Sequence, residues 1–204
     1  MLDFGYYNMD CMQGMKEFPD KYFDLAIVDP PYGINIEKSR RLKKYNTEKV
    51  WDNKIPSDDY FKELFRVTKN QVIWGGNYFD LPPTKCFLIW DKKQPQDISF
   101  ASCEFAWTSF DTVAKTFYYS PMNDKDTRIH TTQKPVALYE WILRRYANDG
   151  DIILDTHVGS ASSLIACYNT NHKFVGFELD KYYYELSKKR LDAEMAQMRI
   201  TDFI

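Results

Sequence analysis

The sequence predicts a single open α/β domain with a largely parallel β-sheet. Short apolar segments that suit buried strands alternate with amphipathic segments that suit helices, as in parallel sheets covered by helices. Most of the predicted strands end at a polar residue, as strands do where they open onto a ligand crevice. The chain has 204 residues, of which 44% are hydrophobic and 17% aromatic, and this suits one domain with a sizeable core.

Predicted strands and helices fill the first part of the chain. Apolar or aromatic runs predict strands, in chain order, at residues 2–9, 25–28, 72–74, 86–90, 104–110 and 113–119. The last two of these are joined at Asp111 and suit an antiparallel hairpin. A short helix is expected at 12–18. Ser57 suits the N-cap of a longer helix, because Asp58 and Asp59 occupy its first turn.

The same alternation continues to the end of the chain. Pro135 suits the first turn of a helix, since its missing N–H has no partner there in any case. Apolar runs and helical spacing predict further strands at 152–154 and 174–178 and further helices at 135–148, 162–167 and 182–198. We see no internal repeat and no low-complexity segment.

The composition argues against several classes of protein. No apolar run is long enough to span a bilayer, and the first residues lack the layout of a signal peptide, so we expect a cytoplasmic protein. The net charge of −2 argues against a uniformly basic nucleic-acid binder but allows a local basic patch. No CxxC pair occurs, so neither a zinc knuckle nor a redox dithiol is expected. The cysteines are Cys11, Cys86, Cys103 and Cys167.

The segment Leu25–Tyr32 places a carboxylate and an aromatic ring at the end of a strand. Four apolar residues precede Asp29, and Pro30 and Pro31 then end the strand because proline donates no ladder hydrogen bond. Asp29 and Tyr32 are therefore expected where open α/β sheets form their ligand crevices. The simpler alternative is a strand-ending turn with an exposed tyrosine.

A second candidate site lies between Asp155 and Ser162. Asp155 ends a buried strand, and a loop of small residues leads into a helix, so that the backbone can approach a ligand and free N–H groups can face it. Glu178 ends the next strand, 23 residues after Asp155, where an acid can bind ribose hydroxyls. This layout is typical of the nucleoside-binding half of a Rossmann-like fold. The absence of GxGxxG disfavours a dinucleotide, and an ordinary tight turn is the simpler alternative.

Both segments, in this order, make the chain resemble the β-class DNA amino-methyltransferases, in particular the small adenine-N6 or cytosine-N4 methylases of phages and prophages. In that class the catalytic motif precedes the cofactor motif. Asp29-Pro30-Pro31-Tyr32 matches motif IV, Thr132-Gln133-Lys134-Pro135 matches the TQKP of motif X, and Asp155–Ser162 matches motif I. Glu178 matches the acid of motif II, and Asp10 resembles the aspartate that meets the cofactor adenine. The similarity covers nearly the whole chain.

The resemblance implies a Rossmann-like methyltransferase domain with permuted motif order, acting on adenine N6 in double-stranded DNA after the base leaves the helix. The implied cofactor is S-adenosylmethionine, and no metal is implied. The implied catalytic residues are Asp29, Pro30, Pro31 and Tyr32. The implied cofactor-binding residues are Asp10, Asp29, Thr131, Gln133, Lys134, Asp155, His157, Gly159, Ser160, Ser162 and Glu178. The catalytic half would span about 1–119 and the cofactor half about 131–204, in a bacterial or phage-infected cell. Family members often dimerise, so a homodimer is compatible.

The chain departs from the DPFxGSGT pattern that most of the family has at motif I. Thr156 and His157 replace Pro-Phe, and Ala161 replaces the second glycine. If that position requires a positive φ, an alanine strains it and weakens cofactor binding. His157 is explained at least as well by a structural, hydrogen-bonded role as by a catalytic one. The chain also leaves little room for a separate target-recognition domain.

Residues 33–56 form a long, charged segment that exceeds an ordinary connection, which indicates a functional loop facing DNA. A solvated loop without a ligand would carry the same charges. The candidate contacts with DNA phosphates are Lys38, Arg40, Arg41, Lys43 and Lys44.

Adenine is favoured over cytosine because an aspartate heads motif IV, where many cytosine-N4 enzymes carry serine. Cytosine N4 remains the alternative target. A third interpretation is a non-catalytic protein that has a methyltransferase scaffold and binds DNA or a partner. Ala161 and the missing recognition domain suggest this interpretation.

Overall fold

The computed structural model describes residues 1–35, 52, 54–95, 101–123, 128–130 and 132–197. An eight-stranded sheet forms its centre, with the strand order β1-β8-β7-β2-β3-β5-β4-β6. The strands are β1 (Gly5–Asn8), β2 (Phe23–Val28), β3 (Thr68–Trp74), β4 (Phe87–Asp91), β5 (Cys103–Thr108), β6 (Lys115–Tyr118), β7 (Ile152–Asp155) and β8 (Lys173–Glu178). The helices are α1 (Cys11–Met15), α2 (Asp58–Val67), the 3-10 turn η3 (Gly76–Tyr78), α3 (Val136–Tyr146), α4 (Ser162–Asn169) and α5 (Lys181–Met195).

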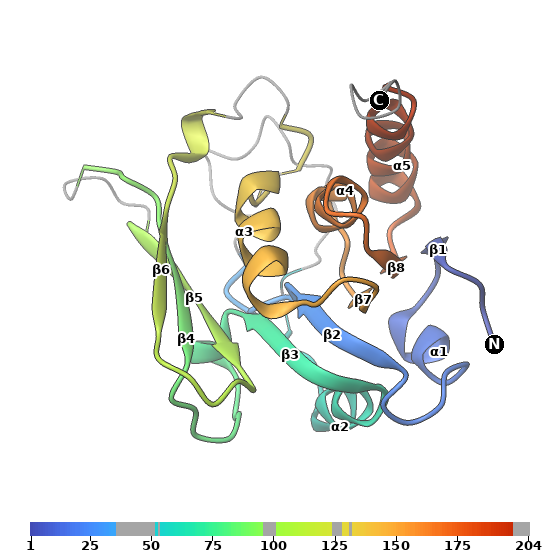
Figure 1. The fold of residues 1–204 in the computed structure, drawn as a ribbon, viewed down its shortest axis with the longest axis horizontal. Helices are drawn as coiled ribbons and strands as arrows, with labels where there is room; N and C mark the ends of the chain where they lie inside the picture. Colours follow the sequence, from blue (N-terminus) through green and yellow to red (C-terminus); the bar gives the residue numbers. More distant parts are fainter. Residues whose placement is uncertain (36–51, 53, 96–100, 124–127, 131, 198–204) are drawn as a thin grey trace.

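Helices cover both faces of this sheet. α3, α4 and α5 lie on one face, and α1 and α2 lie on the other (Figure 1). Successive side chains of a strand point to opposite faces, so an unbroken apolar run needs helices on both sides. In β2, Leu25 and Ile27 pack in the cluster that contains α3 and α4, whereas Ala26 and Val28 pack in the cluster that contains α1 and α2.

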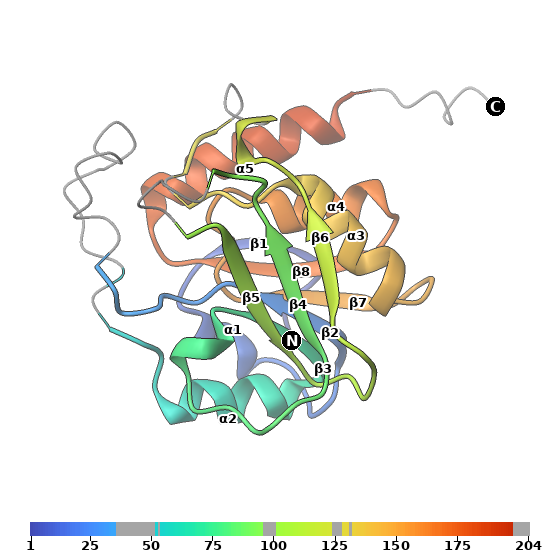
Figure 2. The same cartoon turned by 90° about the vertical axis from the view of Figure 1, so that its left-hand side faces the viewer.

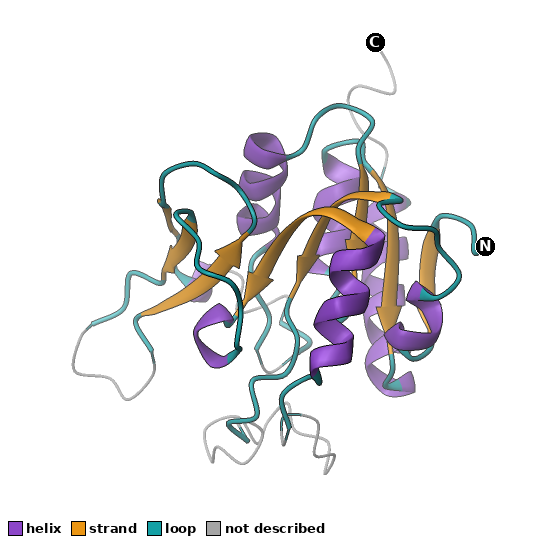
Figure 3. Ribbon diagram, turned by 90° about the horizontal axis from the view of Figure 1, so that it is seen from below, coloured by secondary structure: helices purple, strands orange, loops and turns teal. Residues whose placement is uncertain are grey.

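β2 and β7 are parallel neighbours although most of the chain separates them. Leu25 pairs with Ile153, and Ala26 pairs with Leu154. Parallel strands end at the same edge of a sheet, and most strand arrows in Figure 3 point to one edge. Asp29 and Asp155, the polar residues at the ends of these two strands, therefore lie at a common edge.

The expected hairpin between residues 104–110 and 113–119 is wrong. β5 lies between β3 and β4 and runs antiparallel to both, whereas β6 pairs in parallel with β4 at the border of the sheet (Figure 2). The physical reason is burial. Leu88 and Trp90 of β4 are at most 2% exposed and require an interior position, while the exposed Lys115 and Tyr118 of β6 suit an edge.

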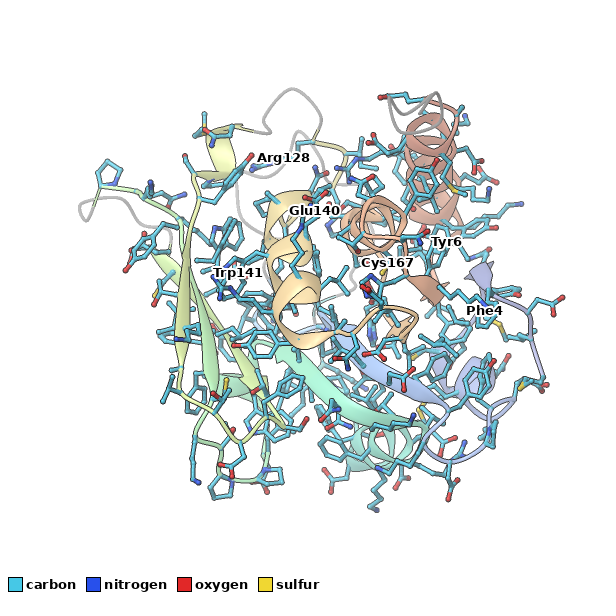
Figure 4. The ribbon with its side chains drawn as sticks, viewed as in Figure 1. Phe4, Tyr6, Arg128, Glu140, Trp141 and Cys167 are labelled. Atoms are coloured by element: carbon cyan, nitrogen blue, oxygen red, sulfur yellow. The ribbon has the colours of Figure 1, made fainter. Side chains whose placement is uncertain are left out.

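Helix α3 supports this end of the sheet. Trp141 lies on the side of α3 that faces β6 (Figure 4), and its ring centre is 5.5 Å from that of Phe117. The other expected elements are present with shifted ends: β1 is shorter than 2–9, β3 begins at Thr68, and Ser57 stands at the N-cap position of α2. In the described part of the chain, no helix is long and apolar enough to cross a membrane.

Candidate active site

Asp29 and Tyr32 form one hydrogen-bonded unit directly after β2. The Tyr32 hydroxyl donates to Asp29 Oδ1 at 2.5 Å. The buried carboxylate of Asp52 holds the turn, because its Oδ1 accepts the N–H groups of Tyr32 at 2.6 Å and Gly33 at 2.8 Å. The directions of the Asp29 carboxylate and the Tyr32 ring are thus set together.

The turn after β3 forms a wall against the Tyr32 ring. Tyr78 stacks on Tyr32 with ring centres 5.0 Å apart and planes tilted by 15°, and Tyr78 is itself 43% exposed. Gly75 has a φ of +70°, and a Cβ at this position would lie 2.2 Å from the Tyr32 ring. Only glycine therefore fits here. Trp74, the last residue of β3, is fully buried in the core.

Lys134 contacts the Asp29 carboxylate. Its side chain is 2% exposed, and Nζ lies 2.5 Å from Asp29 Oδ2, 3.0 Å from Glu104 Oε2 and 3.2 Å from the Tyr32 hydroxyl. Burial alone would lower the pKa of Lys134, but Asp29 and Glu104 raise it above its ordinary value. Burial raises the pKa of Asp29, which the Lys134 ammonium opposes and the Glu104 carboxylate assists. The lysine expected beside a cofactor is thus bonded to the candidate catalytic carboxylate.

The loop after β7 is built around Asp155. Its Oδ1 accepts the His157 N–H at 2.9 Å, and the Ser163 hydroxyl donates to Oδ2. Burial raises the pKa of Asp155 to about 7, against the effect of these two hydrogen bonds. Asp155 is 3% exposed, so the loop encloses a carboxyl group that a nearby cation would stabilise in its charged form.

Neighbouring elements fix the remainder of this loop. Arg190 of α5 donates to Ser160 O at 2.7 Å and to Ser162 Oγ at 2.9 Å. Glu178 Oε2 accepts the Gly159 N–H at 2.9 Å, and its Oε1 accepts the Asp180 N–H at 2.9 Å. Burial raises the pKa of Glu178. Glu178 therefore binds the backbone of the loop in this structure, and its contact with a ribose remains a proposal.

Ala161 adopts the conformation that its position in the motif suggested. Its φ is +60°, in the left-handed region that favours glycine. Its methyl group is fully buried in the cluster that contains Val158 and Leu164. The strained backbone of Ala161 therefore lowers the stability of the fold, whereas the burial of its methyl group raises it.

The Thr156–His157 pair has a partner on α2. Tyr60 and Thr156 share a hydrogen bond of 2.7 Å, and Thr156 Oγ1 lies 2.9 Å from His157 Nδ1. The rings of Tyr60 and His157 meet edge to face with centres 5.4 Å apart. Burial lowers the pKa of His157 to about 4, so the ring is neutral at physiological pH. This supports the structural interpretation of His157.

The remaining candidate residues fall into two groups. Asp10 caps α1 by accepting the Met12 N–H at 2.7 Å, and it lies beside the end of β8 because Met9 N donates to Glu178 O. Gln133 Oε1 accepts the Ile129 N–H at 2.9 Å. The candidates that lie outside the described residues are Thr131, Lys38, Arg40, Arg41, Lys43 and Lys44. Within the described ranges, no group of three or more His, Cys, Asp or Glu is placed to hold a metal ion.

Among the residues that hold the site, the sequence expectations missed Glu104, Asp52 and Tyr60. Each acts on a residue that is distant in the sequence, so local pattern carries no information about it. A glutamate in the otherwise mostly apolar β5 was an available indication for Glu104. For Asp52 and Tyr60 we find no such indication.

Comparison with known proteins gives the family. The model of the DNA methylase family, N6_N4_Mtase, matches residues 73–189, which is more than half of the chain. The chain belongs to the DNA methylase family. The matched range of this DNA methylase begins after Asp29–Tyr32 and includes Glu104, Lys134 and the Asp155 loop.

Curated relatives extend over most of this DNA methylase. The type II methyltransferase M.HpaI of Haemophilus parainfluenzae is 24% identical over 236 residues, covering 91% of this chain and 73% of the relative. The type II methyltransferase M.BglII of Bacillus subtilis is 23% identical over 247 residues, covering 92% of this chain and 69% of the relative.

Solved structures share the fold. M1.HpyAVI in its complex with SAM matches with a TM-score of 0.62 and 23% identity, over 91% of this chain and 98% of that one. The cytosine-N4-specific PvuII DNA methyltransferase matches with a TM-score of 0.60 and 14% identity, over 93% of this chain and 90% of that one. At these identities the likeness shows the arrangement of the sheet and helices.

We predict that Ala161→Gly changes the free energy of unfolding by less than about 1 kcal/mol. Relief of the left-handed backbone, on the order of 1 kcal/mol, is offset by loss of a buried methyl group worth about 0.8 kcal/mol. Urea denaturation of both proteins measures the difference. Ala161→Val is the control and destabilises clearly, because a β-branched residue tolerates positive φ poorly. A large stabilisation by glycine would show that strain dominates.

We predict that His157→Phe loses less stability than the wild type as the pH drops from 6.5 to 4. His130 and His157 have pKa values lowered to about 4 by burial, so the unfolded chain takes up their protons first. Asp155, raised to about 7, acts in the opposite sense: its contribution is largest at low pH and is lost as the pH rises toward 7. Asp29 and Glu178, whose pKa values burial also raises, act in the same sense as Asp155, so the test is the difference between the two proteins, in which the contribution of His157 is removed. Denaturation at several pH values measures the slope, and equal slopes in both proteins would contradict the prediction.

Proposed function

We propose that this DNA methylase transfers a methyl group from S-adenosylmethionine to the N6 amine of adenine in double-stranded DNA. One observation carries the proposal: the Asp29–Tyr32 unit at the end of β2 lies next to the Asp155 loop at the end of the parallel neighbour β7. In this proposal the Asp29–Tyr32 unit binds the amine and the Asp155 loop binds the methyl donor, so the two reactants are held side by side. In these terms the catalytic half is about 1–119 and the cofactor half about 131–204.

The residues at this edge fit S-adenosylmethionine. Gly159 has a φ of +54°, and a Cβ there would meet nothing closer than 4.0 Å, so a ligand can approach its backbone. Asp155 and Glu178 end the adjacent strands β7 and β8, and Asp10 follows the neighbouring β1. Their carboxyl groups suit ribose hydroxyls and positive charge. When bound, S-adenosylmethionine supplies a methyl group activated by a sulfonium charge.

Asp29 prepares the exocyclic amine for attack. The lone pair of this amine is delocalised into the base, which makes it a poor nucleophile. In the proposal one amine N–H is accepted by the Asp29 carboxylate and the other by the carbonyl oxygen of Pro30, which favours a pyramidal nitrogen with a free lone pair. Asp29 also stabilises the positive charge that develops on nitrogen during transfer.

Tyr32 and Tyr78 suit a base that has left the duplex. The stacked pair of rings lies beside Asp29, and Tyr78 is partly exposed, so the edge of the site offers aromatic surface on which a base can stack. Pro31 fixes the backbone between Asp29 and Tyr32. The proposed phosphate contacts are basic residues of the 33–56 segment, namely Lys38, Arg40, Arg41, Lys43 and Lys44, and they predict DNA binding that weakens with salt.

The choice of adenine rests on the aspartate that heads the motif. A cytosine-N4 enzyme shares the fold, so fold alone does not distinguish the two targets. Incubation with labelled S-adenosylmethionine and DNA, followed by nucleoside analysis, is expected to yield N6-methyladenine. N4-methylcytosine alone would overturn the choice of base. No methyl transfer together with no cofactor binding in calorimetry would favour a non-catalytic DNA-binding protein.

We predict that Asp29→Ala lowers kcat about a thousandfold or more, because the amine loses its acceptor and the transition state loses its counter-charge. Calorimetry is expected to show retained cofactor binding, and circular dichroism a retained fold. Asp24→Asn is the matched control: Asp24 lies at the opposite end of β2 and pairs with Lys69 at 2.6 Å, so it reports the loss of an ion pair away from the site. Turnover near that of the wild type in Asp29→Ala would refute the role assigned to Asp29.

A further inference from the structure

A buried chain of alternating charges leads away from Asp29. Lys134 Nζ lies 2.5 Å from Asp29 Oδ2 and 3.0 Å from Glu104 Oε2, and Lys92 Nζ lies 2.7 Å from Glu104 Oε1. These side chains are between 2% and 24% exposed. They come from four separate places in the sequence: after β2, in β5, after β4 and before α3. The two cations and two anions sum to zero.

The Lys134 ammonium has a complete set of acceptors. An ammonium group has three N–H donors, and Asp29, Glu104 and the Tyr32 hydroxyl lie within 3.2 Å of it. Its charge also lies 5.2 Å from the centre of the Trp74 ring. Removal of Glu104 would leave a buried cation with a single carboxylate, so the position of Nζ depends on Glu104 as well as on Asp29.

The two carboxyl groups on Lys134 have different environments. Glu104 is mostly buried but lies between two lysines, which lower its pKa to about 2. Asp29 shares one lysine and feels the negative charge of Glu104, and burial raises its pKa. The two carboxyl groups therefore have different roles. Glu104 stays ionised as the counter-ion of Lys134, and Asp29 retains its affinity for hydrogen-bond donors. An ammonium that Asp29 held alone would compete directly with the target amine.

We propose that Glu104 is a positioning residue that shares the Lys134 ammonium with Asp29 and so leaves the Asp29 carboxylate able to bind the target amine. This inference rests on the function proposed above. Lys92 completes the arrangement, because its ammonium binds the second carboxylate oxygen of Glu104. Glu104 lies on β5 and belongs to none of the sequence motifs identified above.

Other titratable groups face this chain and enter its pH dependence. The phenol of Tyr139 on α3 is buried beside Asp29 and Glu104, and the ring of His130, which is partly buried, lies close to Lys134. The carboxyl group of Asp155 feels the charge of Asp29 from the neighbouring strand. The Glu104 charge also raises the pKa of Tyr139, which lies well above that of a free phenol and therefore far from the acidic limb. His130 and Asp155 receive no direct contribution from Glu104, so a shift of the acidic limb between variants reports the chain itself.

Glu104→Gln tests the proposal through the pH profile of kcat. A negative neighbour raises the pKa of a carboxyl group, so removal of the Glu104 charge is expected to move the acidic limb, set by Asp29, about one unit lower. The plateau of kcat is expected to fall about tenfold or more, because the Lys134 ammonium shifts toward the Asp29 carboxylate when Glu104 no longer shares it. The KM for S-adenosylmethionine is expected to change less than twofold. Glu104→Asp, which keeps the charge, is expected to return the acidic limb toward its wild-type position.

Glu63→Gln is the matched control, because Glu63 on α2 is 17% exposed and pairs with Arg66 at 2.7 Å, outside the site. It removes a comparable ion pair and is expected to leave the profile unchanged. If Glu104→Gln and Glu63→Gln behave alike in an active enzyme, the positioning role is wrong while the proposed function stands.

A second measurement does not require activity. With ¹⁵N-labelled lysine, NMR is expected to show a slowly exchanging ammonium signal for Lys134, assigned by its loss in Lys134→Arg. This signal is expected to persist in Glu63→Gln and to vanish through faster exchange in Glu104→Gln. An unchanged signal in Glu104→Gln would overturn the proposal. If the wild type transfers no methyl group, the proposed function fails, and this signal still decides whether Glu104 holds Lys134.

Discussion

The parallel pairing of β2 with β7 is the constraint on which the site depends. Its register places Ala26 opposite Leu154, so the residues that follow the two strands are delivered to one edge with little freedom. β8 and β1 extend the same edge, which adds Glu178 and Asp10, and β3 adds the turn that carries Tyr78. A shift of this register would separate the Asp29 carboxylate from the Asp155 loop and turn apolar side chains to the wrong face.

Charge is buried at this edge in a balanced form. An isolated buried carboxylate or ammonium is strongly disfavoured, because water solvates it better than protein does. Here Asp29, Lys134, Glu104 and Lys92 neutralise one another in sequence, and each ion has a partner of opposite sign within 3.0 Å. Such a set is sensitive to loss of any one member, since the remaining ions lose their compensation. For the same reason, the four charged groups are compensated only in an arrangement that keeps each ion beside its partner.

The local part of the site could be predicted from the sequence. Asp29 and Asp155 were expected at strand ends because prolines follow the first and a loop of small residues follows the second, and strand endings are decided by nearby residues. The place of Ala161 in a motif raised the question of a positive φ, and the structure has it at +60°. The prediction of a hairpin between β5 and β6 was wrong, because both strands pair with β4 instead. The sequence segments alone do not show which strand pairs with which.

The amino-acid order was sufficient to establish the class of fold, the ends of the central strands and the type of residue offered at those ends, since these follow from apolar periodicity and from proline and glycine. The folded chain alone established that Lys134 binds Asp29, that Glu104 and Lys92 complete the charges, and that Asp52 and Tyr60 hold the two turns. These contacts join residues far apart in sequence, and their strength comes from exclusion of water. Burial is a property of the packed sheet and helices, so no local pattern encodes it.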